Sequence, residues 1–241
     1  MRVIIVGGLG NDADYFKRLR SRLAALDIPT TFVPFDAHSE LRVRATIRTH
    51  SPSQCVLVGN SIGTMIAMRI ATDSPVRRIV LINPPSLFPE SARLNANFPT
   101  NRSCRPLQSR WWMDPRIALR ALWWARYIYP LKLLMRSLYV RLNPMSPKRV
   151  VDNIFASDLA SQAHMVIRHT LQYDFWHALN TLGSRTHILF GTHDDFAHLA
   201  RTVRNNIPNV VVRSYLGGHH HILYHPDELA ASLSISIPQS S

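Results

Sequence analysis

The sequence predicts an α/β fold: a mostly parallel sheet of about six strands, flanked by helices and interrupted by a helical insertion. Two observations predict this fold. Short runs rich in β-branched apolar residues alternate with amphipathic segments, which is the pattern of consecutive strand–helix units. The runs are almost continuously apolar, as expected of parallel strands that are buried on both faces. Residues 85–182 break the alternation and separate it into two parts, 1–84 and 183–241.

The first part, residues 1–84, predicts four strands and three helices in alternation. Pro34 indicates that the second strand lies at an edge of the sheet or ends there, since proline lacks the N–H that a central strand would donate. The acidic start of the first helix suits the helix dipole, and Ser39 is expected to cap the second helix. The strands are expected at 2–6, 30–35, 55–58 and 77–83, and the helices at 12–27, 38–50 and 61–71.

The second part, residues 183–241, adds two strand–helix units. Its strands are expected at 187–190 and 210–216, and its last helix at 226–233, which opens with proline, a residue favoured at the first helical position. The intervening segment, 85–182, begins with several prolines and continues as apolar helical sequence with regularly spaced arginines. We expect this segment to form a basic, aromatic-rich helical lid inserted between two strands of the core.

The composition argues against a secreted or membrane-spanning protein. The first apolar run, 3–6, is too short for a signal peptide, and no run approaches the ~18 apolar residues of a membrane-spanning helix. The two cysteines, Cys55 and Cys104, do not predict a disulfide framework, and Cys55 is expected to be a small core residue. We therefore expect a cytoplasmic location, with peripheral contact to a membrane left open.

The net charge of +13 is concentrated in one segment. Residues 101–150 hold 11 Lys and Arg against 1 acidic residue, and they also contain four of the five tryptophans. The plainest interpretation is a lid whose aromatic side chains face the core and whose arginines face water. The alternatives are an aromatic pocket for an acyl group, and a docking surface for an anionic membrane, an acidic carrier protein or a coenzyme A phosphate. No nucleic-acid-binding motif accompanies the charge, so nucleic acid is not an expected partner.

A serine between two glycines, Gly59-Asn60-Ser61-Ile62-Gly63, follows the third predicted strand and precedes the third helix. On such a tight turn the serine adopts a strained backbone conformation with its hydroxyl above the sheet edge, and its neighbours two positions away must be small. The N–H groups at the start of the helix favour negative charge there. The pattern predicts that Ser61 is a nucleophile; the alternative is a glycine-flanked turn without chemistry.

A nucleophilic serine needs a base, and the base needs an acid that orients it. Asp194 comes three residues after the strand that ends at Gly191, and His219 directly follows the two glycines after the last strand. Because the carboxyl ends of parallel strands share one edge of a sheet, the serine, the acid and the histidine are expected at that edge. His220 is the main alternative base, and Asp195 is the alternative acid.

These motifs resemble those of the α/β-hydrolase family over about 1–84 and 183–241. The serine turn resembles the family's nucleophile turn, and the position after the fourth strand, where an acid is an alternative in the family, holds Asn83. The other matching segments are Gly191-Thr192-His193-Asp194 for the acid turn, Gly218-His219 with Pro226 for the histidine loop, and Gly7-Gly8-Leu9-Gly10 for the oxyanion loop, with Gly7 in place of the usual histidine.

The resemblance implies catalytic roles and a reaction. It implies a core that lacks the family's first two strands, because the sequence opens at the strand before the oxyanion loop. The implied roles are nucleophile for Ser61, base for His219, acid for Asp194, and oxyanion donor for the N–H groups of Leu9 and Ile62.

The implied reaction is hydrolysis of an ester or thioester through an acyl-enzyme, with no cofactor and no metal. A metal site at His221 and His225 is a weaker alternative, since Pro226 is expected to start the helix after them. The aromatic lid favours a hydrophobic acyl or ring-containing small molecule as the substrate. Acyl transfer or cyclisation by the same residues, and a non-catalytic ligand-binding protein on this scaffold, are the alternative functions.

Overall fold

The computed structural model divides the chain into two compact units, one formed by residues 1–87 and 174–241 and the other by residues 88–173. The residues that it describes are 1–84, 129–142, 147–156, 175–194, 197 and 199–236. Most of the predicted lid, 85–182, lies outside these residues, so its boundaries stay a prediction.

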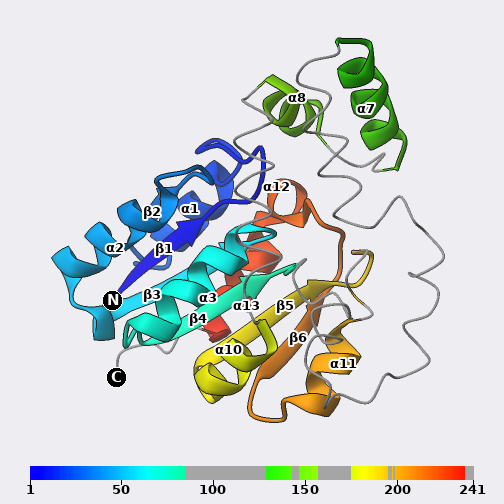
Figure 1. The fold of residues 1–241 in the computed structure, drawn as a ribbon. Helices are drawn as coiled ribbons and strands as arrows, with labels where there is room; N and C mark the ends of the chain where they lie inside the picture. The colour runs from blue at the N-terminus through cyan, green and yellow to red at the C-terminus, as the bar shows by residue number, and fades with distance from the viewer. Residues whose placement is uncertain (85–128, 143–146, 157–174, 195–196, 198, 237–241) are drawn as a thin grey trace. The chain divides into compact units, whose positions relative to one another are not determined.

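A six-stranded, wholly parallel sheet forms the centre of the first unit (Figure 1). The strands are β1 (Arg2–Val6), β2 (Thr30–Val33), β3 (Cys55–Asn60), β4 (Arg78–Ile82), β5 (Thr186–Gly191) and β6 (Val211–Tyr215). Their order across the sheet is β2-β1-β3-β4-β5-β6. The predicted α/β class with a parallel sheet of about six strands is therefore confirmed.

Helices cover both faces of this sheet (Figure 1). The described helices are α1 (Lys17–Ala24), α2 (Ser39–His50), α3 (Gly63–Asp73), α7 (Tyr129–Leu142), α8 (Lys148–Ala156), α10 (Phe175–Leu182), α11 (Leu199–Asn206), α12 (His221–Tyr224) and α13 (Pro226–Ser236). On one face α3 contacts both α2 and α10, and on the other α1 packs with α13. None of the described helices is both long enough and apolar enough to cross a bilayer.

Burial of the strands follows their position in the sheet. Every residue of the central strands β3 and β5 is buried, as are Val3–Val6 of β1 and Ile79–Ile82 of β4. The edge strands β2 and β6 are each buried at a single residue. The predicted edge position of β2 is confirmed: the strand ends at Val33, directly before Pro34. Cys55 is a buried core residue, as expected, and burial raises the pKa of its thiol.

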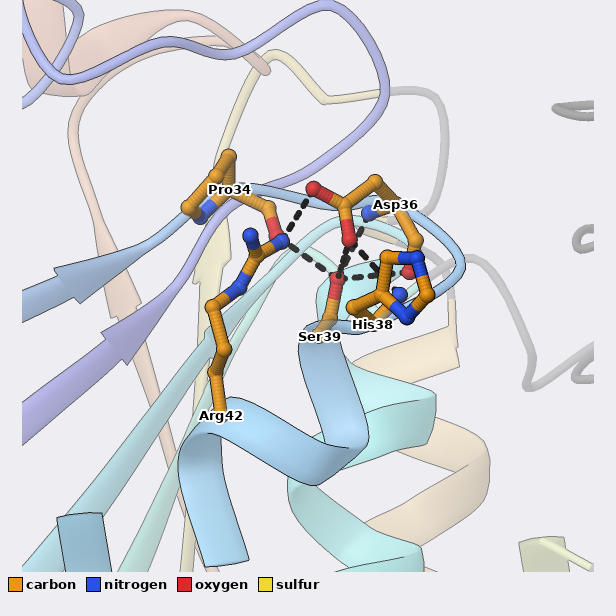
Figure 2. Close-up of polar contacts among 5 residues, drawn as sticks. All are labelled: Pro34, Asp36, His38, Ser39 and Arg42. Atoms are coloured by element: carbon orange, nitrogen blue, oxygen red, sulfur yellow. Dashed lines mark hydrogen bonds and ion pairs between the residues drawn. The ribbon is translucent and has the colours of Figure 1, made fainter. Parts of the chain in front are cut away.

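The predicted cap of α2 is wrong, because Ser39 bonds to the preceding loop and not to a helix N–H. Ser39 Oγ accepts a hydrogen bond from the Asp36 N–H at 2.6 Å and lies 2.6 Å from the Pro34 carbonyl, to which it donates (Figure 2). The Asp36 carboxylate accepts from the His38 N–H at 2.8 Å and pairs with Arg42 (Figure 2). These bonds tie the turn after β2 to the first turn of α2.

The first helix also begins later than its sequence predicts. Asp12 Oδ1 accepts a hydrogen bond from the Tyr15 N–H at 2.9 Å, and the backbone turns there before α1 starts at Lys17. The acidic residues expected in the first helical turn therefore lie in the loop before it. The side-chain bond of Asp12 competes with helical geometry, which is typical of aspartate near a helix start.

The described part of the second unit is the helix pair α7 and α8. Asp152 on α8 binds Arg136 of α7 at 2.7 Å and Lys148 of its own helix at 3.3 Å. The Tyr139 and Phe155 rings meet edge to face, with centroids 6.1 Å apart. Apolar side chains on α7 are left exposed to solvent: Leu133, Leu134, Leu138 and Val140.

Candidate active site

The predicted site residues come from loops at the carboxyl ends of neighbouring strands. Ser61 follows β3, and Asp194 and His219 follow β5 and β6. Leu9 lies just after β1, the other neighbour of β3. Because all six strands are parallel, these loops lie at the same edge of the sheet, as the sequence predicts.

Ser61 sits on a strained turn between β3 and α3. Its φ of 51° lies in the left-handed region, which non-glycine residues seldom adopt. The surrounding backbone holds this conformation. The Ser61 N–H donates to the Ile82 carbonyl on β4 at 2.8 Å, and the Ser61 carbonyl accepts from the Thr64 N–H at 3.0 Å and from Thr64 Oγ1 at 2.6 Å. Strain that several bonds maintain is typical of functional sites.

The two glycines of the turn are required by close backbone contacts. A Cβ at Gly59 would lie 2.5 Å from the Thr64 Cα, and one at Gly63 would lie 2.3 Å from the Gly7 carbonyl oxygen. Real Cβ atoms do not approach backbone atoms this closely. The start of α3 can therefore pack against both β3 and the end of β1 only when these positions carry no side chain, which is the reason that the sequence indicated.

The loop after β1 passes directly beside Ser61. A Cβ at Gly8 would lie 2.9 Å from the Ser61 Cβ. The residue that braces this loop, Asn11, was not predicted from the sequence. Its buried Oδ1 accepts from the Gly8 N–H at 2.6 Å and from Asn60 Nδ2 at 3.0 Å. Asn11 thus joins the loop after β1 to the serine turn, in a loop where Gly7 replaces the histidine usual in the family.

Two backbone N–H groups near Ser61 are available as donors. Within the described part of the chain, the N–H groups of Leu9 and Ile62 donate to no other residue. Both belong to the turns that meet at Ser61. This arrangement is compatible with the predicted oxyanion donors, whose catalytic role stays a prediction.

His219 and Asp194 form a hydrogen-bonded pair. His219 Nδ1 lies 2.7 Å from Asp194 Oδ2, and the Asp194 side chain is 0% exposed whereas that of His219 is 30% exposed. A carboxylate can only accept, so His219 carries its proton on Nδ1 and leaves Nε2 as the basic nitrogen. Asp195, the alternative acid, lies outside the described residues.

His220, the alternative base, makes a different contact. Its Nδ1 lies 2.9 Å from the Tyr15 hydroxyl. Burial, followed by the positive charge of His219, lowers the pKa of His220 to about 3, against the opposing effect of Asp194. This imidazole is therefore neutral at physiological pH, and the geometry favours His219 as the partner of the acid.

The remaining histidines of this loop pack with one another. As the sequence predicts, Pro226 begins the last helix, α13, and His221 and His225 precede it; His221 also begins a separate short helix, α12. The rings of His221 and His225 stack with centroids 4.6 Å apart, and His221 Nε2 lies 3.1 Å from Glu228 Oε2. Among the described residues, no group of three or more His, Cys, Asp or Glu side chains could hold a metal ion.

Asn83, at the end of β4, contacts both the acid turn and the histidine loop. Its Oδ1 accepts from the Gly191 N–H at 2.9 Å, and its Nδ2 donates to the Tyr215 hydroxyl at 2.6 Å and to the His219 carbonyl at 3.4 Å. Burial raises the pKa of this tyrosine above its ordinary value. The sequence showed only that Asn83 cannot serve as a carboxylate; it did not reveal these bonds.

Comparison with known proteins places this geometry in a family. No curated protein sequence matches the chain. Among solved structures, MenH from S. aureus has 14% sequence identity and a TM-score of 0.74, with 98% of this chain and 92% of that chain covered. The enol-lactonase from Burkholderia xenovorans LB400 has 14% identity and a TM-score of 0.64, with 98% and 90% covered. The thioesterase domain from the curacin biosynthetic pathway has 12% identity and a TM-score of 0.57, with 97% and 90% covered.

At such low identity these likenesses concern the fold alone. The family match is independent of them: residues 3–232 match the alpha/beta hydrolase family, which covers nearly the whole sequence, including every predicted site residue. The chain belongs to the alpha/beta hydrolase family.

Proposed function

We propose that the chain is a serine hydrolase that cleaves an ester or thioester through an acyl-enzyme, with Ser61 as nucleophile, His219 as base and Asp194 as acid. The observation that carries the proposal is the 2.7 Å contact between His219 Nδ1 and the buried Asp194 carboxylate, at the sheet edge that also carries the strained Ser61 turn. The family supports hydrolase activity in general. An orienting acid on a histidine at that edge supports the serine-type mechanism in particular.

The buried Asp194 carboxylate has a defined task in this mechanism. By accepting from Nδ1 it fixes the imidazole tautomer and orientation, and it stabilises the positive charge that the ring gains when Nε2 takes a proton. With its side chain 0% exposed, the carboxylate is screened little by water, which strengthens that interaction. The side chain of His219 itself is 30% exposed.

In the first half-reaction, Ser61 Oγ attacks the carbonyl carbon of the substrate while its proton passes to His219 Nε2. The carbonyl oxygen becomes an oxyanion, which the N–H groups of Leu9 and Ile62 would stabilise. The intermediate then collapses, and the carbon–oxygen or carbon–sulfur bond breaks. The alcohol or thiol leaves with the proton from His219, and the acyl group stays on Ser61.

In the second half-reaction, water replaces the leaving group. His219 takes a proton from the water as it attacks the acyl carbon, and the oxyanion forms again in the same place. Collapse of this intermediate returns the proton to Ser61 and releases the acid. If another nucleophile of the substrate attacks in place of water, the same residues carry out cyclisation or acyl transfer.

Two observations bear on the substrate class: the names of structurally similar proteins and the sequence of the predicted lid. The enol-lactonase, and carboxylesterases of Nitrososphaera gargenis with 17% identity and a TM-score of 0.59, act on esters by their names, and the curacin domain is named a thioesterase. Together with the aromatic sequence of the predicted lid, these names favour a hydrophobic acyl or ring-containing small molecule.

Labelling with a fluorophosphonate probe tests the proposal, because only an activated serine reacts. We expect one labelled site in the native chain, mapped to Ser61, and no labelling of Ser61→Ala. Ser53→Ala is a matched control, because Ser53 is an exposed serine beyond the opposite end of β3. Labelling that persists in Ser61→Ala contradicts the assignment of the nucleophile.

Turnover separates the enzyme from a binding protein on the same scaffold. A serine hydrolase is expected to release the chromophore of a short-chain chromogenic ester, and His219→Ala is expected to lower that rate by several orders of magnitude. His220→Ala is the matched control and should cost far less. Absence of both turnover and labelling in the native chain would favour the non-catalytic alternative.

A further inference from the structure

Asn83 is a buried side chain whose hydrogen bonds reach both the strand that leads to Asp194 and the loop that carries His219. It is 0% exposed and occupies the first position after β4, between β3 with Ser61 and β5 with Asp194. Its φ of 49° lies in the left-handed region, which asparagine tolerates better than most residues. Its backbone N–H donates to the Leu189 carbonyl at 2.9 Å, so the residue is fixed against β5.

The bonding pattern requires an amide. Oδ1 must accept, because it faces the Gly191 N–H, and Nδ2 must donate, because it faces the His219 carbonyl. A carboxylate could make the first bond but not the second, since it would set a negative oxygen against a carbonyl oxygen. It would also add a second negative charge near the His219 loop, in competition with Asp194.

The two loops that Asn83 joins are also joined to each other. The Thr192 N–H donates to the Tyr215 carbonyl at 2.9 Å, and the His193 N–H donates to the Gly217 carbonyl at 2.9 Å. The side chain of Asn83 adds bonds to the Tyr215 hydroxyl and to the His219 carbonyl of the histidine loop. Its side chain therefore contributes to the spacing between the acid turn and the histidine loop.

We propose that Asn83 is a positioning residue: its amide fixes the loop of His219 against the turn of Asp194 and so holds their side chains in contact. The expected loss of kcat rests on the proposed function, whereas the expected effect on the contact between His219 and Asp194 does not. Asn83 itself touches no reacting atom. Its loss should lower kcat about 10- to 100-fold with KM nearly unchanged, the cost expected when a buried hydrogen bond that aligns the base is lost.

Two variants test the proposal. Asn83→Ala removes all side-chain bonds, whereas Asn83→Asp keeps the size and the bond from Gly191 but loses the donation to His219. Asn206→Ala is the control, because its amide donates to the Thr202 carbonyl at 2.7 Å within α11, away from these loops. Steady-state kinetics, thermal unfolding and the NMR resonance of the proton between His219 and Asp194 are measured for each.

We expect both Asn83 variants to lose kcat and to shift or broaden that proton resonance, while Asn206→Ala changes neither. In Asn83→Asp the deficit relative to the native chain should shrink as the pH falls toward about 4, because the protonated carboxyl can donate again. Unchanged kcat and an unchanged resonance in Asn83→Asp would overturn the proposal, as would unfolding of both variants, which would assign Asn83 to the fold. If the native chain has no activity, the proposed function fails, and the resonance alone still decides the positioning role.

Discussion

Acid should destabilise this chain through two histidines that the folded chain holds in the neutral form: His187, which is buried, and His220, which is partly buried. Burial, followed by the positive charges of Arg78 and Arg213, lowers the pKa of His187 to about 4, and the pKa of His220 is about 3. Their ordinary pKa is 6.5. Below pH 6.5 these histidines bind protons in the unfolded chain but not in the folded chain. The free energy of unfolding therefore falls as the pH decreases from 6.5 toward the folded-state pKa. Between about pH 7 and about pH 5, each histidine lowers the free energy of unfolding by about 2 kcal/mol, and the pair lowers it by about 4 kcal/mol.

Urea unfolding at about pH 7 and pH 5 measures this loss, because the unfolding free energy is obtained at each pH by linear extrapolation. His187→Gln and His220→Gln should each remove about 2 kcal/mol of the difference between the two pH values, since glutamine does not titrate. Asn206→Ala, which removes no titratable group, is the control and should leave the difference unchanged. If the unfolding free energy of His187→Gln falls between about pH 7 and about pH 5 by as much as that of the native chain, His187 is not held neutral in the folded chain and the reasoning fails.

Two further predictions concern the serine turn and the basic segment. Gly63→Ala should lower the free energy of unfolding by about 1–3 kcal/mol and abolish probe labelling, because its Cβ would lie 2.3 Å from the Gly7 carbonyl oxygen. Gly218→Ala is the control: its nearest contact would be 3.7 Å, so its free energy of unfolding should equal that of the native chain. If residues 101–150 bind an anionic membrane, binding to phosphatidylserine vesicles should weaken when salt rises from ~50 to ~500 mM, which shortens the Debye length from roughly 13 to 4 Å. Turnover of a small neutral ester should not change, and equal binding to uncharged vesicles would contradict an electrostatic attachment.

The sequence predicted the fold well because its strongest signals are local. Each predicted strand overlaps an observed strand, since buried parallel strands must be apolar along their whole length. The glycines of the serine turn were also predictable, because the need for small neighbours follows from the turn itself. The errors occur at polar helix starts. Ser39 and Asp12 have side chains that can bond either to a helix N–H or to a loop, and sequence alone does not decide between them.

The site was predictable only in part, for a related reason. The order of Ser61, Asp194 and His219 at strand ends indicates a common edge, because parallel strands place all their carboxyl ends together. The bonds of Asn11 and Asn83 join segments that are far apart along the chain, and no local sequence pattern predicts them. Asparagine after a strand is common in turns for local reasons, so its presence at these positions does not by itself predict such a connection.

The choice of asparagine at both connections has a common electrostatic reason. Each amide must accept a backbone N–H on its oxygen: Asn11 from Gly8, and Asn83 from Gly191. A carboxylate would accept these bonds equally well, but at a sheet edge built around one buried acid, Asp194, a further negative charge would repel it and would oppose the oxyanion expected beside Ser61. A neutral amide joins the loops without changing the charge of the site. With amides at these two positions, the buried carboxylate that contacts His219 is that of Asp194, which orients the histidine.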